Sequence, residues 1–331
     1  MTLKDHFPEL YDNNLWNEQD DEAYERFNHD FTPEKFQDAV DGAITTREVG
    51  GRNFRVFVDT PVEHNGSSIA IPGEYANGTK EAGFDRPSGA FRRGLAIRAI
   101  VDPAARLIVL PNDTLFENNL NLSKDERRVI GKGGLTLPLV DRLRIAIEDT
   151  DRVTMVGFSQ GAVVANDYAA VGAPLDALAI VEAPNVVERS KLSLALEFPK
   201  SGGHLHDNFA VSGLAPQTAK ERSHGERAYG LDILTRSNIA LLNPMRRNSM
   251  SDGIASALDA HAGVVHTWAA DTDVSPADVN KRIAKKFQDD ELYQSYEFAG
   301  DFADHSITNV YPLGAAVTRR AIQLGDTSIS D

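Results

Sequence analysis

The segment from Val153 to Val164 constrains the fold more than any other part of this chain. It reads Val-Thr-Met-Val-Gly-Phe-Ser-Gln-Gly-Ala-Val-Val and places Ser159 at the centre of a Gly-x-Ser-x-Gly pentapeptide. The apolar, partly β-branched residues before the pentapeptide are typical of a buried strand, and the small residues after it suit a helix packed closely on a sheet. Because glycines permit a sharp turn, the segment predicts a strand, a tight turn and a helix, with Ser159 on the turn.

Strand and helix patterns alternate along most of the remaining chain. Apolar runs predict strands at residues 69–71, 106–110, 152–156, 175–181, 264–268 and 293–298. Helical patterns cover about 91–100, 135–147, the segment after Pro276 and 308–324. This succession predicts an α/β fold in which a mostly parallel central sheet carries helices on both faces. Residues 46–59, with a Gly50-Gly51 turn, predict an antiparallel hairpin that opens the sheet.

Three regions follow from these patterns. Residues 44–184 and 264–331 form the predicted core. Residues 185–263 are far longer than the roughly 10–12 residues that a strand-to-strand crossover needs, and we interpret them as a lid insertion over the carboxyl ends of the strands. A decorative insertion is the alternative. Residues 1–43 form an acidic arm whose many aromatic residues predict that it packs on another surface.

Composition excludes several classes of protein. The formal net charge of -15 argues against nucleic acid and anionic membranes as partners, since both repel such a surface. No apolar run approaches the roughly 20 residues that span a bilayer, so integral membrane association is not expected. The N-terminus lacks the pattern of a signal peptide, and cytoplasmic localisation is expected. The absence of cysteine excludes disulfides and a cysteine nucleophile.

A serine at such a turn becomes a nucleophile only beside a base that a carboxylate orients. Of the nine histidines, only His305 follows the last predicted strand and directly precedes a helix. This place puts it at the same edge of the sheet as Ser159. The alternative is that His305 merely starts the helix.

Two aspartates follow the strand at 264–268 and are candidates for the acid. We favour Asp273, which stands before the Val-Ser-Pro that starts the next helix, and Asp271 is the alternative. The chain order Ser159, Asp273, His305 is the order described for turns of this type.

Over residues 44–325 the chain resembles the α/β-hydrolase fold family. The match rests on the opening hairpin, the stretch that ends at Pro276, the late Asp-His-Ser around His305, and the Gly-Phe-Ser-Gln-Gly-Ala turn, which is similar to that of carboxylesterases, cutinase-like esterases and phage cell-wall esterases. The resemblance implies an oxyanion hole made by the backbone N–H of Gln160 and a second N–H from Glu74 or Tyr75. The chain departs from the family there, since the loop reads Pro-Gly-Glu-Tyr rather than the usual His-Gly.

These features predict a serine hydrolase of the esterase or lipase type, which cleaves a carboxylic ester through an acyl-enzyme and needs neither a cofactor nor a metal. The expected substrate is a small-molecule or lipid ester, and an acyltransferase or perhydrolase would use the same triad. Candidate pocket residues are Phe158, Leu234 and Leu241. The alternative from another class is a non-catalytic or accessory protein for binding or assembly, with residues 1–43 as a protein-docking segment.

Overall fold

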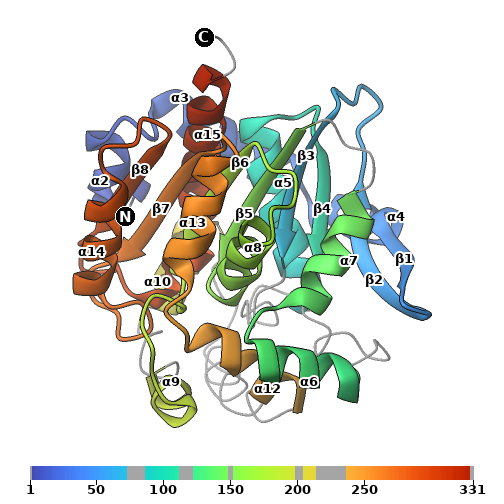
Figure 1. Cartoon of the computed structure of the whole chain (residues 1–331). Helices are drawn as coiled ribbons and strands as arrows, with labels where there is room; N and C mark the ends of the chain where they lie inside the picture. The colour runs from blue at the N-terminus through green and yellow to red at the C-terminus, as the bar shows by residue number, and fades with distance from the viewer. Residues whose placement is uncertain are drawn as a thin grey trace.

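The computed structural model describes residues 2–72, 86–111, 122–147, 152–197, 204–213 and 236–328 (Figure 1). Within these residues the strands form one eight-stranded sheet in the order β1-β2-β4-β3-β5-β6-β7-β8. Strand β2 is antiparallel to β1 and to β4, and the pairs from β4 through β3 to β8 are all parallel. The predicted α/β fold with a mostly parallel sheet and an antiparallel opening is therefore confirmed.

The strands are short and, in the centre of the sheet, almost wholly apolar, as expected where helices cover both faces. Their bounds are β1 Ile44–Val49, β2 Arg52–Asp59, β3 Ser67–Pro72, β4 Arg106–Leu110, β5 Arg152–Phe158, β6 Ala177–Val181, β7 Gly263–Ala269 and β8 Tyr293–Phe298. Each coincides with a segment in which the sequence predicts a strand. The hairpin turn is Gly50-Gly51, where φ is +57° and +78°, a conformation that glycine adopts without strain.

The helices connect the strands and extend the chain at its N-terminus. Their bounds are α1 Leu3–His6, α2 Pro8–Asp12, α3 Glu18–Asp30, α4 Pro33–Ala43, α5 Arg86–Val101, α6 Lys124–Gly133, α7 Leu137–Ile147, α8 Gln160–Ala170, α9 Lys191–Glu197, α10 Leu205–Val211, α12 Arg236–Met245, α13 Met250–Asp259, α14 Ala277–Phe287 and α15 Tyr311–Ser328. A short 3₁₀ helix, η4, covers His305–Asn309.

Two apolar layers enclose the sheet. Helices α7, α8 and α13 lie in front of it in Figure 1, and α5 and α15 lie behind it. The front layer buries side chains such as Leu143, Tyr168 and Ile254 against the sheet. The rear layer buries Phe91 and Val317 in a separate cluster. Since every central strand is covered on both sides, its carboxyl end is the place where polar side chains can gather.

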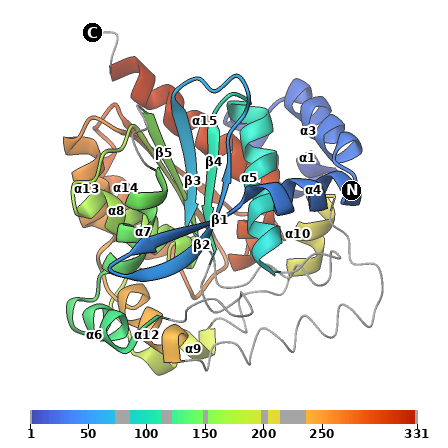
Figure 2. The ribbon, with the colours of Figure 1, turned by 90° about the vertical axis from the view of Figure 1, so that its right-hand side faces the viewer.

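The N-terminal arm packs on the rear layer of the chain itself (Figure 2). Phe7, Leu10, Trp16 and Phe36 are each at most 2% exposed and belong to the rear apolar cluster. The sequence predicted that the arm packs on some surface, and the described structure shows that this surface is the chain's own core.

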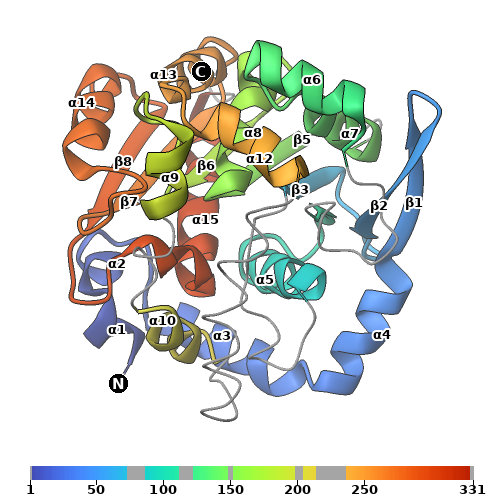
Figure 3. The same ribbon diagram turned by 90° about the horizontal axis from the view of Figure 1, so that it is seen from below.

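The insertion between β6 and β7 divides into parts with different surroundings. Figure 3 views the molecule from the carboxyl ends of the parallel strands, where α9 and α12 lie together with α6. Helix α13, which the sequence assigned to the insertion, packs instead against α8 and β7 as part of the front layer. Apolar residues such as Ile254 and Leu258 are buried there, so α13 is the crossover helix that leads into β7.

No helix in the described part of the chain combines the length and apolar character needed to cross a membrane.

Candidate active site

Ser159 stands on the tight turn between β5 and α8. Its backbone angles, φ 48° and ψ -120°, are rare for a residue with a side chain and cost about 1–3 kcal/mol. The turn is possible because Gly157 lets α8 approach closely: a Cβ there would lie 2.4 Å from Ala162 Cα. Local sequence thus determines the strained turn, which holds the Ser159 side chain beyond the end of the strand.

His305 and Glu182 complete a hydrogen-bonded chain with Ser159. The Oγ of Ser159 lies 2.8 Å from Nε2 of His305. On the other side of the ring, Nδ1 lies 3.0 Å from Oε2 of Glu182. When the Nδ1–H donates to the carboxylate, Nε2 is left as an acceptor for the serine hydroxyl, which is the tautomer that a general base needs.

Glu182 follows β6 directly, and its backbone also has a positive φ of 55°. Its side chain is fully buried, and its Oε1 accepts a hydrogen bond from the backbone N–H of Ala269 at the end of β7. Burial raises the pKa of the Glu182 carboxyl, and the hydrogen bond and charge of His305 partly oppose this rise. A nearby second carboxylate, Asp304, raises this pKa further.

The prediction that Asp273 is the acid beside His305 is wrong. The structure places Glu182, not Asp273, against His305 Nδ1. Asp273 is exposed, and its backbone carbonyl accepts a hydrogen bond from Arg189 at 2.7 Å. Asp271 is also exposed. The physical reason is the strand order. Strand β6 lies directly beside β5, so the residue that follows β6 is next to Ser159, whereas β7 lies one strand farther away.

Sequence reasoning had one available signal for Glu182. A carboxylate directly after the wholly apolar run Ala177–Val181 has no obvious solvent-facing role.

The structure also corrects two of the predicted pocket residues. Phe158 is 0% exposed, and its ring packs in the rear apolar cluster with the Arg93 guanidinium 3.8 Å from the ring centre. Side chains alternate along a strand, so Phe158 faces the rear helices. Leu241 is 2% exposed and belongs to the front apolar cluster, where it contributes to packing.

Among the predicted oxyanion-hole residues, Gln160 is the first residue of α8. Backbone N–H groups at a helix N-terminus point outward, and the helix dipole favours negative charge there. Glu74 and Tyr75, and the third pocket candidate Leu234, lie outside the described residues.

The loop that carries His305 is held by its own polar side chains. Asp304 caps η4, with its Oδ1 accepting from the backbone N–H of Ser306 at 2.8 Å. Asp304, His305 and Ser306 are all at most 6% exposed. Within the described ranges, no group of three or more histidine, aspartate or glutamate side chains is gathered as a metal site requires.

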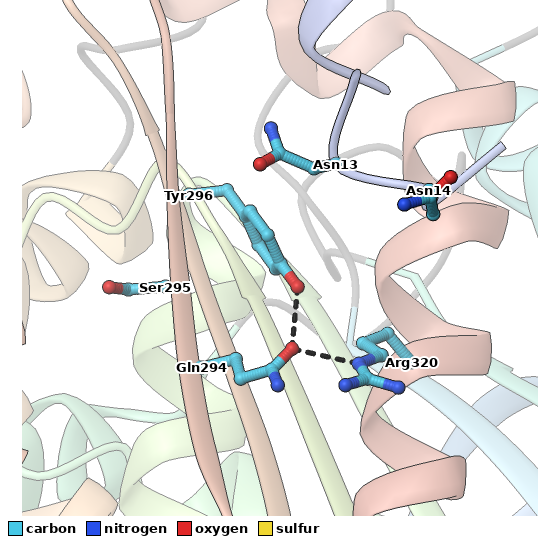
Figure 4. A pocket seen from close by; sticks show the side chains of 6 residues that line it. All are labelled: Asn13, Asn14, Gln294, Ser295, Tyr296 and Arg320. Carbon is cyan, nitrogen blue, oxygen red and sulfur yellow. Dashed lines mark hydrogen bonds between the residues drawn. The ribbon is translucent and has the colours of Figure 1, made fainter. Parts of the chain in front are cut away.

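A separate pocket of about 490 Å³ lies on the edge of the sheet (Figure 4). It lies between the turn after α2, strand β8 and α15, and is lined by Asn13, Asn14, Gln294, Ser295, Tyr296 and Arg320. The Oε1 of Gln294 accepts hydrogen bonds from the Tyr296 hydroxyl and from Arg320 Nε at 2.7 Å. These residues do not include the group around Ser159, and the pocket is a different feature of the molecule.

Solved structures with similar folds support the topology. A bromoperoxidase from Bacillus anthracis gives a TM-score of 0.55 at 8% identity, with 86% of this chain and 99% of that chain covered. A haloalkane dehalogenase variant from Bradyrhizobium elkanii gives 0.51 at 13% identity, covering 86% and 98%. A bacterial membrane phospholipase A gives 0.51 at 12% identity, covering 91% of both chains. No protein-family model and no curated protein sequence matches this chain.

The strand order, the Ser159 turn after β5 and these structural neighbours establish the class of fold. The chain adopts the α/β-hydrolase fold. At such low identities the likeness concerns the fold, and activity has to be argued from the site.

Proposed function

We propose that this protein is a serine hydrolase that cleaves carboxylic esters, with Ser159 as nucleophile, His305 as general base and Glu182 as the acid that orients the histidine. The observation that carries the proposal is the continuous chain of contacts from Ser159 Oγ to His305 Nε2, at 2.8 Å, and from His305 Nδ1 to Glu182 Oε2, at 3.0 Å. Both distances lie within the range for proton transfer and for orientation by hydrogen bonding.

The proposed reaction uses these contacts in turn. His305 Nε2 takes the hydroxyl proton of Ser159 as Oγ attacks the ester carbonyl, and the carbonyl electron pair moves onto oxygen. The imidazolium is stabilised by the Glu182 carboxylate. When the tetrahedral species collapses, the alcohol leaves with the proton from His305, and an acyl-serine remains. Water then attacks the acyl group by the same steps and releases the acid and free Ser159.

The developing negative charge on the carbonyl oxygen needs donors that are already in place. We assign one donor to the backbone N–H of Gln160 at the start of α8. The second donor is proposed to come from Glu74 or Tyr75. Removing one such donor typically costs about 10²–10³ in rate.

The insertion is proposed to form one wall of the acyl site. Helices α9 and α12 lie at the carboxyl ends of the parallel strands (Figure 3). Ile239 of α12 is 42% exposed, in contrast to the buried Leu241. The following residues of α12, 240–245, are all buried, so Ile239 is the residue that we propose for contact with a substrate.

The test of this function is covalent labelling with a fluorophosphonate, which phosphonylates an activated serine and releases fluoride. Wild-type protein should be labelled at Ser159 and should hydrolyse p-nitrophenyl esters. Ser159→Ala should lose both, with a nearly unchanged melting temperature, because a small side chain at a turn contributes little packing. Ser67→Ala is the matched control, since Ser67 begins β3 and pairs with Arg152 at the start of β5, the end of the strand away from Ser159. Turnover that persists in Ser159→Ala would refute the proposal.

A further inference from the structure

Helix α10 comes from the insertion and lies against the loop that carries His305. Three segments distant in the sequence meet there: the arm helix α3, helix α10 and η4. Figure 3 shows α10 beside the arm and the start of α15. The contacts at this junction place α10 in a position to hold the histidine loop.

On the N-terminal side of the loop, Asn208 makes two hydrogen bonds with one amide group. Its Nδ2 donates to the backbone carbonyl of Phe302 at 3.1 Å and to the hydroxyl of Ser306 at 2.7 Å. Asn208 is 0% exposed. Because a carbonyl can only accept, the contact with Phe302 fixes which end of the amide faces the loop.

A backbone contact adds to this side of the junction. The N–H of His204 donates to Oδ2 of Asp304 at 3.0 Å, just before α10 begins. Asp304 and Ser306, immediately before and after His305, therefore both form hydrogen bonds with residues of the insertion.

On the C-terminal side, the hydroxyl of Ser212 bridges two backbone groups. It donates to the carbonyl of Asn309 at 2.8 Å and accepts from the N–H of Tyr311 at 3.0 Å. The carbonyl of Ser212 accepts from the hydroxyl of Tyr24 in α3, also at 2.8 Å. The arm is thus connected to the histidine loop through Ser212.

We infer that Asn208 and Ser212 are positioning residues that hold His305 at its distance from Ser159, and that Tyr24 extends this support to the N-terminal arm. This inference rests on the proposed function. The two residues bond to the loop on both sides of His305, so the backbone that carries the imidazole cannot shift without breaking buried hydrogen bonds. Displacement of a reacting group by about 1 Å can cost roughly 100-fold in rate.

Asn208→Asp is the sharpest variant, because it keeps the shape and turns the contact with the Phe302 carbonyl into an acceptor–acceptor contact. The Ser306 hydroxyl could bond to the new carboxylate only by giving up its own hydrogen bond to Asp304. We expect kcat for a p-nitrophenyl ester to fall by roughly 10- to 100-fold, with KM changed by less than about 3-fold, and the fluorophosphonate labelling rate to fall in parallel. The matched control is Asn166→Asp, which breaks a buried bond from Nδ2 to the Ser249 carbonyl at 3.2 Å, away from the loop. Its kcat should stay within about 3-fold of wild type.

Two milder variants keep the inference testable if Asn208→Asp folds poorly. Ser212→Ala removes only the bridging hydroxyl and should lower kcat several-fold. Tyr24→Phe removes the bond from the arm and should have a smaller effect in the same direction. Tyr11→Phe is its control, because the Tyr11 hydroxyl bonds to Asp21 within the arm.

A readout without substrate separates this inference from the proposed function. The Nδ1 proton of His305, held by Glu182, should give a downfield proton NMR signal in wild type that is weakened or exchanges faster in Asn208→Asp and Ser212→Ala. Wild type that keeps this signal but neither labels nor turns over would refute the hydrolase proposal alone. Variants with wild-type signal, kcat and labelling rate would refute the positioning role.

Discussion

Glu182 serves two donors at once. Its Oε2 accepts from His305 Nδ1, and its Oε1 accepts from the backbone N–H of Ala269. Both carboxylate oxygens are therefore needed as acceptors. An amide of the same shape has one oxygen and one NH₂, so it can satisfy only one of the two donors.

Glu182→Gln should accordingly lower kcat by about 10³–10⁴-fold through the wrong imidazole tautomer, while the protein remains folded. Steady-state kinetics with a p-nitrophenyl ester measure this effect. Asp273→Asn is the matched control and should keep kcat near wild type, since Asp273 is exposed. The reverse pattern would return the acid role to Asp273.

Asp167 shows how burial at a single residue makes stability depend on pH. It is 0% exposed in α8, and its Oδ2 accepts from the backbone N–H and the hydroxyl of Thr136, both at 2.7 Å. Burial raises its pKa from 3.8 to about 6, against the lowering effect of these hydrogen bonds. Between those pH values the folded protein keeps a proton that the unfolded chain has lost, so the contribution of Asp167 to stability falls as pH rises.

Asp167→Asn should remove this dependence, because an amide does not titrate and its oxygen can still accept from Thr136. Relative to the variant, wild type should lose up to roughly 3 kcal/mol of unfolding free energy between pH 4 and pH 7. Urea unfolding at several pH values measures the difference. Parallel curves for the two proteins would show that Asp167 carries no such shift.

At the scale of elements, the contact between β5 and α8 determines where Ser159 stands. At Gly157 an added Cβ would lie 2.4 Å from Ala162 Cα and 2.9 Å from Ala165 Cβ. Both neighbours belong to α8, and the nearest atom is backbone, which cannot rotate away. The helix would have to move as a whole.

Gly157→Ala should therefore destabilise the protein by about 1–3 kcal/mol and lower kcat, because α8 and the Ser159 turn shift together. Chemical denaturation and ester hydrolysis measure the two effects. Gly42→Ala in α4 is the control: nothing lies within 4 Å of its added Cβ, and the change should be neutral or slightly stabilising. Equal stability of the two variants would contradict the close-packing argument.

The packing partners of the helices in residues 185–263 could not be predicted from the sequence. The sequence predicts one insertion over residues 185–263, because the segment is far longer than a strand-to-strand crossover needs. In the structure, α10 supports the histidine loop and α13 is a core helix against α8. The pattern of apolar residues predicts that a helix has a buried face, but does not specify which partner covers it.

At the scale of the whole molecule, the N-terminal arm is joined to the core by a partly buried ion pair. Arg319 in α15 donates to both carboxylate oxygens of Asp20 in α3 and to the carbonyl of Leu15 at 2.8 Å. The Asp20 side chain is 10% exposed. Without Arg319, the Asp20 carboxylate would lose its charged partner and would remain poorly solvated.

Arg319→Met should lower the unfolding free energy by about 1–3 kcal/mol, less than for a fully buried pair because Arg319 is partly exposed. Urea unfolding measures this loss. Arg282→Met is the control, because it removes an exposed ion pair with Asp278 one helical turn away and should have little effect. Equal effects would mean that the arm does not depend on this ion pair.

The N-terminal arm, residues 1–43, is also the segment in which the sequence predicts docking on another protein. Its aromatic residues are used within the chain, as the burial of Phe7, Trp16 and Phe36 shows. A docking surface would use the outer face of the arm, where Tyr11, Phe27 and Phe31 are only partly buried.

The local features could be predicted from the sequence: the strands, the hairpin turn, the α/β class, the turn that carries Ser159, and the place of His305 after the last strand. These follow from periodicity, glycine placement and chain order, which act over a few residues. Three other features could not be predicted in this way: Glu182 rather than Asp273 faces His305, Phe158 faces the rear helices, and α10 bonds to the histidine loop. Each of these depends on which strands and helices become neighbours, and burial and strand order fix that choice through contacts between residues far apart in the chain.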